Sequence, residues 1–354
     1  GQQLKPVPTN EVDDGLPEGV RFALPAPTPA PPQPRAPVEL PPELPRETPE
    51  PFEWPPVHLV ALFIALLLLL AVWATALYNV YKHSQAFETP DLQRHIVAMH
   101  FMAPIHATAA TVCLASFILL PLGAFVSYFI LLRDFYMAFT VASLWWFLTD
   151  SVGGEKSLTA RMERMDQADL LFPLSFVAPW AMGFEMMFNC RLGVMQFVVT
   201  MPLLAVLRFC AHGLGLSDGT LFSPLDLALC VLAAASALVA LYCFAQLYHS
   251  SKEALADRLI SPLWKLSVVL AAVFLVFFQS LVVRLVVSMI VLPTMWQLDD
   301  SVYVIVGVEQ WFVTLEMLVV AVLVNAYYPV DESLGVPLLP KREGVSTKTF
   351  SVFV

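Results

Sequence analysis

Charged residues are scarce in this chain. Only 14% of its 354 residues are Asp, Glu, Lys or Arg, whereas 58% are hydrophobic, and a soluble protein of this length needs a more highly charged surface. The sequence also lacks a Cys-x-x-Cys pair, a glycine-rich phosphate loop and a Gly-x-Ser-x-Gly elbow. We therefore expect no enzyme activity, no metal site, and no cofactor other than bound lipids. The net charge of -10 argues against nucleic acid as a partner.

What the sequence does contain is seven long apolar runs. A hydrocarbon core of ~30 Å needs about 20 apolar residues in a helix to cross it. The sequence therefore predicts an all-α polytopic membrane protein with a seven-transmembrane-helix bundle, surrounded by the lipid bilayer. The predicted spans are Val57 to Tyr78, Ile96 to Leu119, Leu122 to Leu148, Gly193 to Ala211, Asp226 to Tyr248, Leu266 to Val291 and Val302 to Tyr327.

The distribution of Lys and Arg predicts the orientation of the bundle. The connections after the first, third and fifth spans and the C-terminal tail carry basic residues, whereas the three opposite connections carry none. By the positive-inside rule, the C-terminus lies on the cytosolic side, or on the matrix or stromal side in an organelle, and the N-terminus lies outside. Which membrane holds the protein is left open.

The chain divides into three parts by composition: residues 1–56, 57–328 and 329–354. The first part holds 17 of the 29 prolines, and nine acidic residues against four basic ones. Such a strip favours the extended polyproline II conformation and has no core of its own. It is either a disordered tether or a segment held by one or more protein partners.

Several polar residues fall inside the predicted spans, where they are expensive and point to function or packing. They are Arg133, Asp134, Gln279, Arg284, Glu309, Gln310 and Glu316. Counted at 1.5 Å per residue, Arg284 and Glu309 both lie roughly 10 Å from the outer ends of their spans. Gln279 and Glu316 both lie roughly 20 Å deep by the same count.

These depths predict contacts between neighbouring spans. Glu309 and Glu316 are two turns apart and share a helix face, with Arg284 as the expected counter-ion of Glu309 and Arg133 as a candidate partner of Glu316. Buried pairs that fix the helix register are one interpretation. A polar floor under a ligand cavity, or a proton-linked carboxylate, is the other.

The longest inner connection contains Leu158, Met162 and Met165 at helical spacing among charged residues. This pattern predicts a short helix that either lies in the membrane interface or is a solvated loop helix.

The order of several segments resembles a known family. DSVGGEK at 150–156 follows LRDFYMAFTVASLWWF, and four further segments come after it. They are CRLGVMQFVVTMPLLAVL from Cys190, LFSPLDLAL from Leu221, FFQS from Phe277 and VEQWFVTLEMLVVAV from Val308. This succession is similar to the organic solute transporter alpha-subunit family, which includes the transmembrane protein 184 group, and it covers residues 96–332.

The resemblance implies seven helices, an outside N-terminus, possible transport of amphipathic anions such as sterol conjugates, and a possible single-span partner subunit. The matched positions are Gly153, Gly154, Glu155, Cys190, Gly193, Gln196, Pro202, Ser223, Pro224, Gln279, Gln310 and Glu316. The sequence departs from the family at Met137, where the family often has Glu. The long Pro-rich tail is a second departure.

Two functions compete on this evidence. One is a facilitative carrier in which Gln279, Gln310 and Glu316 contact the solute, and in which Pro104 and Pro202 kink their helices. The other is a non-catalytic structural or accessory subunit of a large membrane complex, anchored through its Pro-rich tail. A receptor-like role rests on the number of helices alone.

Overall fold

The computed structural model describes residues 56–86, 89–118, 123–216, 224–286 and 298–330, all within the unit formed by residues 53–354. These ranges contain helices and no strand. The helices are α1 (Pro56–Gln85), α2 (Pro90–Ile118), α3 (Gly123–Ser151), α4 (Glu155–Met162), α5 (Phe184–Gly213), α6 (Pro224–Ala256), α7 (Pro262–Val286) and α8 (Leu298–Tyr327). The Pro-rich tail lies outside the described residues, as does nearly all of the C-terminal tail.

Six of these helices are long and apolar enough to cross a membrane: α1, α2, α3, α5, α6 and α8. In α7 the apolar run covers Pro262–Val276 within the residues whose side chains are described. The prediction of an all-helical membrane protein is confirmed. Pro104 and Pro202 lie inside α2 and α5, as the sequence predicts.

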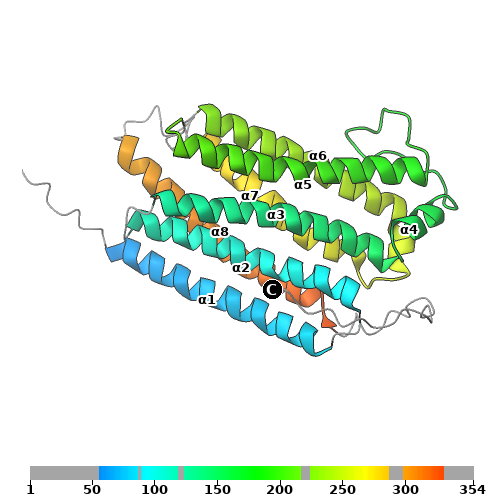
Figure 1. The fold of residues 1–354 in the computed structure, drawn as a ribbon, viewed down its shortest axis with the longest axis horizontal. Coiled ribbons are helices and arrows are strands. Elements are labelled where there is room, and N and C mark those ends of the chain that lie inside the picture. Colours follow the sequence, from blue (N-terminus) through cyan, green and yellow to red (C-terminus); the bar gives the residue numbers. More distant parts are fainter. Residues whose placement is uncertain (1–55, 87–88, 119–122, 217–223, 287–297, 331–354) are drawn as a thin grey trace, which may run out of the picture. The chain divides into compact units, whose positions relative to one another are not determined.

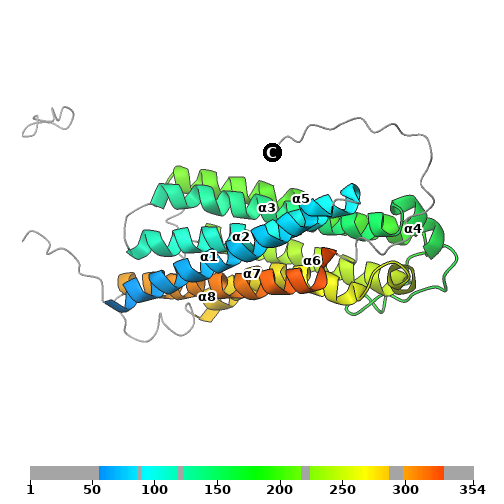
Figure 2. The same cartoon turned by 90° about the horizontal axis from the view of Figure 1, so that it is seen from below.

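The long helices pack in two rows. One row contains α2, α3 and α5 in order of contact, and the other contains α8, α7 and α6 (Figures 1 and 2). Contacts between α2 and α8 join the rows at one side, and contacts between α5 and α6 join them at the other. Helix α1 packs on both α2 and α8 and so covers that first junction.

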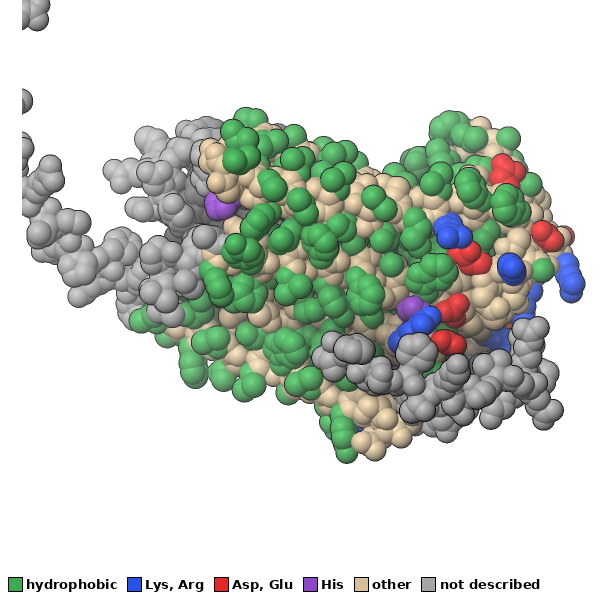
Figure 3. Space-filling model, in the orientation of Figure 1, with side chains coloured by type: hydrophobic (Ala, Val, Ile, Leu, Met, Phe, Trp, Pro, Cys, Tyr) green, Lys and Arg blue, Asp and Glu red, His purple; other side chains and the backbone are tan. Residues whose placement is uncertain are grey.

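Burial differs sharply between α1 and α2. In α2, 72% of the apolar span is buried inside the protein, against 22% in α1. The outward face of α1 presents large apolar side chains, including Phe63 and Leu70. Figure 3 shows apolar side chains spread over most of one face, with Lys, Arg, Asp and Glu gathered at one end. This distribution suits a bundle whose sides contact lipid and whose end contacts water.

Helices α5 and α6 approach closely at Gly193. A Cβ atom built on Gly193 would lie 2.2 Å from Sγ of Cys243 on α6, so only glycine leaves room for that sulfur. One turn further along α5, the Gln196 amide donates to the Ser236 carbonyl at 2.9 Å and its oxygen accepts from the Ser236 hydroxyl at 3.0 Å. Two helices in lipid gain from such small residues and reciprocal hydrogen bonds.

The short helix α4 differs from the sequence prediction. Leu158 and Met162 are fully buried in the main core, Met165 packs against that core, and α4 contacts α6. The apolar face of this segment therefore packs on protein rather than on lipid or water. Helical spacing in the sequence identified the apolar face but not the surface that covers it.

The contact at Gly193 gives a test of the packing of α5 on α6. We expect Gly193→Ala to lower the free energy of unfolding by about 1–3 kcal/mol, because the added methyl overlaps the Cys243 sulfur. The double variant Gly193→Ala/Cys243→Ala should recover part of the loss. Thermal unfolding in detergent, with Gly213→Ala as control, measures this, since a Cβ on Gly213 meets nothing within 4 Å. Equal melting temperatures for Gly193→Ala and the control would contradict the close approach.

Candidate functional site

A buried carboxylate held by two arginines lies between α3 and α5. The Asp134 side chain is 5% exposed, and its Oδ1 accepts from Nε and Nη2 of Arg133 at 2.8 and 2.7 Å. Its Oδ2 accepts from Nη1 of Arg208 on α5 at 3.4 Å. In the first contact two guanidinium nitrogens share one oxygen at short distances, whereas the second is a single long bond. The two helices are thereby linked by charge in their apolar region.

A second carboxylate completes the balance of charge around this cluster. Glu309 on α8 is buried and interacts electrostatically with Arg133. Two arginines and two acids then give no net formal charge. Such neutrality matters inside a membrane, where an uncompensated charge costs several kcal/mol.

The second polar contact joins α7 to α8. The Gln279 amide faces the Glu316 carboxylate, and with the amide oriented to donate, Nε2 lies 2.7 Å from Oε2 and 3.2 Å from Oε1. Both side chains are half-buried. Residues predicted at equal depth on antiparallel spans therefore do meet.

The charges pair differently from the arrangement expected from depth alone. Arg133 is bound to Asp134, its neighbour in sequence, while the carboxylate of Glu316 faces an amide. The side chain of Arg284 lies outside the described residues, so its expected pairing with Glu309 stays a prediction. Gln310 is half-buried, and its carbonyl accepts from the Thr314 hydroxyl at 3.0 Å.

The Gly-Gly-Glu segment forms the turn between α3 and α4. Gly153 and Gly154 have φ of 98° and 93°, a conformation that other residues adopt at a cost. Glu155 follows, and its Oε1 accepts from the Trp145 indole at 3.0 Å while its Oε2 accepts from Arg191 on α5 at 2.9 Å. This motif fastens three helices at the charged end and holds no reactive group.

The remaining family positions lie along α5 and α6. Gln196 bonds to Ser236, Pro202 lies within α5, and Pro224 begins α6. Ser223 lies outside the described residues. Of these positions, Gln196 links the two helices through its contact with Ser236.

Sequence reasoning missed Arg208, Ser236 and Arg191 as partners. Arg208 is a lone cation in the apolar run MPLLAVLRFCAHG, and this signal was present in the sequence. Its Nε is buried without a hydrogen-bond partner, and its side chain is 26% exposed.

Met137, where the family often has an acid, is buried in the apolar core one turn after Asp134.

Chemically, the site can bind and orient a polar group. Among the residues that the structure describes, no group of three or more His, Cys, Asp and Glu side chains is placed to hold a metal ion. Arg208 keeps donors that Asp134 does not use, and the Gln279–Glu316 pair offers both donors and acceptors.

Comparisons with known proteins agree with the resemblance seen in the sequence. Residues 61–333 match the family of the organic solute transporter Ostalpha. The chain is 24% identical over 303 residues to Protein LAZ1 homolog 2 of Arabidopsis thaliana, a match that covers 80% of this chain and 71% of that protein. No solved structure matches.

The family match spans most of the chain, and the helices are long and apolar enough to cross a membrane. The chain is thus an integral, multi-pass membrane protein that belongs to the organic solute transporter Ostalpha family.

Proposed function

We propose that the protein is a facilitative carrier of amphipathic organic anions such as sterol conjugates. Membership of a solute transporter family supports transport rather than enzyme activity. The proposed path for the solute runs between α3, α7 and α8, where α3 and α7 are in contact. A single-span partner subunit is part of the same proposal.

The observation that carries the proposal is the contact between Gln279 and Glu316. The Glu316 carboxylate faces a neutral amide, and no ion pair among the described residues reaches it. A carboxylate that faces a neutral amide inside an apolar helix pair is a costly arrangement that commonly marks a substrate or ion pathway. With Gln310 nearby in sequence, the pair would accept and donate hydrogen bonds to the hydroxyl and amide groups of a solute.

Arg208 is the proposed contact for the acidic group of the solute. It makes one long hydrogen bond to Asp134, its Nε has no partner, and a quarter of its side chain is exposed. A guanidinium of this kind can bind a carboxylate or sulfate through two parallel N–H groups. Arg208 lies on α5, which packs on α3, so this contact would lie on the α3 side of the proposed path.

The proposed topology has seven spans, with α7 as the sixth, an outside N-terminus and a cytosolic, matrix or stromal C-terminus. The helix α7 has 25 residues, which is long enough to cross the hydrocarbon core. The gathering of charged side chains at one end of the bundle supports the placement of that end on the basic, inner side (Figure 3).

The alternative function is that of a non-catalytic accessory subunit anchored through residues 1–56. The observation in its favour is the composition of that tail, which holds 17 of the 29 prolines and suits recognition by a partner protein. The buried Met137 also leaves the third span without the acid that the family often carries there.

Uptake of a radiolabelled sterol sulfate into proteoliposomes tests the carrier directly. We expect Glu316→Gln to slow uptake about fivefold, because a charged acceptor binds a hydroxyl more strongly than a neutral one by about 1 kcal/mol. Glu253→Gln is the control, since Glu253 is exposed on α6. Equal uptake by Glu316→Gln and wild type would remove this carboxylate from the mechanism. No uptake by the intact protein would contradict the carrier itself.

Deletion of residues 1–52 separates the two functions. Under the carrier proposal, the shortened chain keeps its uptake, because the described helices all lie in the unit formed by residues 53–354. Under the accessory alternative, neither form transports, and proteins that co-purify with the full chain are lost on deletion. Uptake in vesicles and mass spectrometry of co-purified proteins give both readouts from one pair of preparations.

A further inference from the structure

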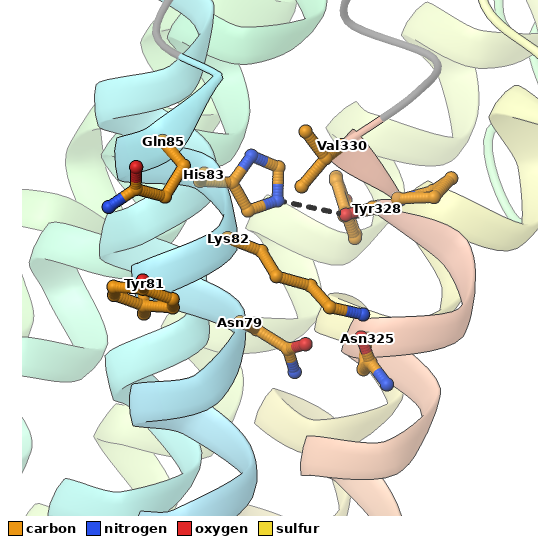
Figure 4. Close-up of a pocket in the computed structure, with 9 residues that line it drawn as sticks. Asn79, Tyr81, Lys82, His83, Gln85, Asn325, Tyr328 and Val330 are labelled. Atoms are coloured by element: carbon orange, nitrogen blue, oxygen red, sulfur yellow. Dashed lines mark hydrogen bonds between the residues drawn. The ribbon is translucent and has the colours of Figure 1, made fainter.

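A cavity of about 320 Å³ lies between the ends of α1 and α8, at the end of the bundle that carries the basic residues. Nine residues line it, and we call it the α1–α8 cavity. Its floor is formed by the buried residues Asn79, His83 and Tyr328, and its rim includes the exposed Lys82 and Asn325. Figure 4 shows Asn79 and Lys82 directed from α1 toward Asn325 on α8. The volume is at the lower end of the range for small-ligand sites.

The floor of the α1–α8 cavity holds polar atoms without partners. Asn79 is 2% exposed and its Nδ2 has no hydrogen-bond partner; His83 is 1% exposed and its Nδ1 has none. An unpaired buried polar atom costs about 1–3 kcal/mol, so Nδ2 of Asn79 favours a ligand that can pair with it, whereas Nδ1 of His83 is an acceptor while Nε2 donates. Nδ2 of Asn79 is a donor by its chemistry and calls for an acceptor oxygen.

The charge around the α1–α8 cavity also favours an anion. Lys82 is on its rim, and no acidic residue is among the nine that line it. Helix C-termini normally repel anions, and both α1 and α8 end here. At α8 the effect is offset, because His83 Nε2 donates to the Tyr328 carbonyl at 3.1 Å and the Lys265 ammonium donates to that of Tyr327. Two of the last carbonyls of α8 are thus already bound to basic side chains.

The position of the α1–α8 cavity indicates which class of anion it binds. Helix α1 has 30 residues and is therefore ~45 Å long, which exceeds the ~30 Å hydrocarbon core. Lys82 lies in its last turn, about 39 Å from Pro56 by the same count, which is farther than the core is thick. Tyr78 and Tyr81 are exposed beside it, as aromatic residues are at a membrane interface. Basic pockets at this level between membrane helices bind lipid head groups.

We propose that the α1–α8 cavity binds the phosphate group of an anionic phospholipid. Lys82 supplies the charge, and the Asn79 and Asn325 amides supply neutral donors to the phosphate oxygens. The site is distinct from the Gln279–Glu316 pair, because Asn325 lies nine residues, or ~14 Å, along α8 from Glu316. The inference does not rest on transport, and lipid binding without uptake would leave it intact.

The test measures the melting temperature of the full-length protein in detergent while short-chain lipids are added. We expect short-chain phosphatidylglycerol to raise it in a saturable way and phosphatidylcholine to raise it less. In Lys82→Gln the phosphatidylglycerol concentration for half the effect should rise about fivefold. Lys252→Gln is the control, since it removes an exposed cation from the same end on α6.

Asn79→Ala separates binding from a purely structural role. The variant removes an unpaired buried donor, so without lipid it should be at least as stable as wild type. Its melting temperature should nevertheless rise less than that of wild type when phosphatidylglycerol is added.

The second arm of the test adds inorganic phosphate at matched ionic strength in place of the lipid. A Lys82-dependent rise with inorganic phosphate equal to that with the lipid would overturn the lipid as the source while keeping the phosphate chemistry. Equal effects of the two lipids, or of Lys82→Gln and Lys252→Gln, would overturn the site altogether.

Discussion

The hydrocarbon core of a membrane offers no partner to a charged group, and the arrangement of this bundle depends on that constraint. Asp134 is held by Arg133 and Arg208, and Glu309 balances the second positive charge. Because these residues come from α3, α5 and α8, their neutrality requires that both rows of helices keep their register. Helix α2, whose apolar span is largely buried, then packs against the neighbouring helices.

The polar contacts outside this neutral cluster are of two kinds. The Gly-Gly-Glu turn and the Gln196–Ser236 pair fasten helices through hydrogen bonds between neighbouring helices. Gln279 and Glu316 instead pair an acid with an amide, and Asn79 and His83 leave atoms unpaired at the charged end. Contacts of the first kind stabilise the fold, whereas those of the second kind carry the proposed functions.

The sequence was sufficient to predict the helical membrane fold, the family and the equal depth of Gln279 and Glu316. The length of an apolar run and the depth of a residue along its helix can both be counted from the sequence. The contact of Asp134 with Arg208 could not be counted in this way, because it depends on the rotation of α3 about its axis and on which helix lies beside it. For the same reason the apolar face of α4 was found, but its burial against the core was not.

A double-mutant cycle on the Asp134 cluster tests the central claim most directly, with the free energy of unfolding measured in mixed micelles. Asp134→Asn leaves two half-buried arginines against one acid, and we expect a loss of about 3–5 kcal/mol. Asp134→Asn combined with Arg133→Met restores neutrality, so the double variant should be more stable than the sum of the two single losses predicts. Strictly additive losses would show that charge balance does not hold these helices together and would contradict the account.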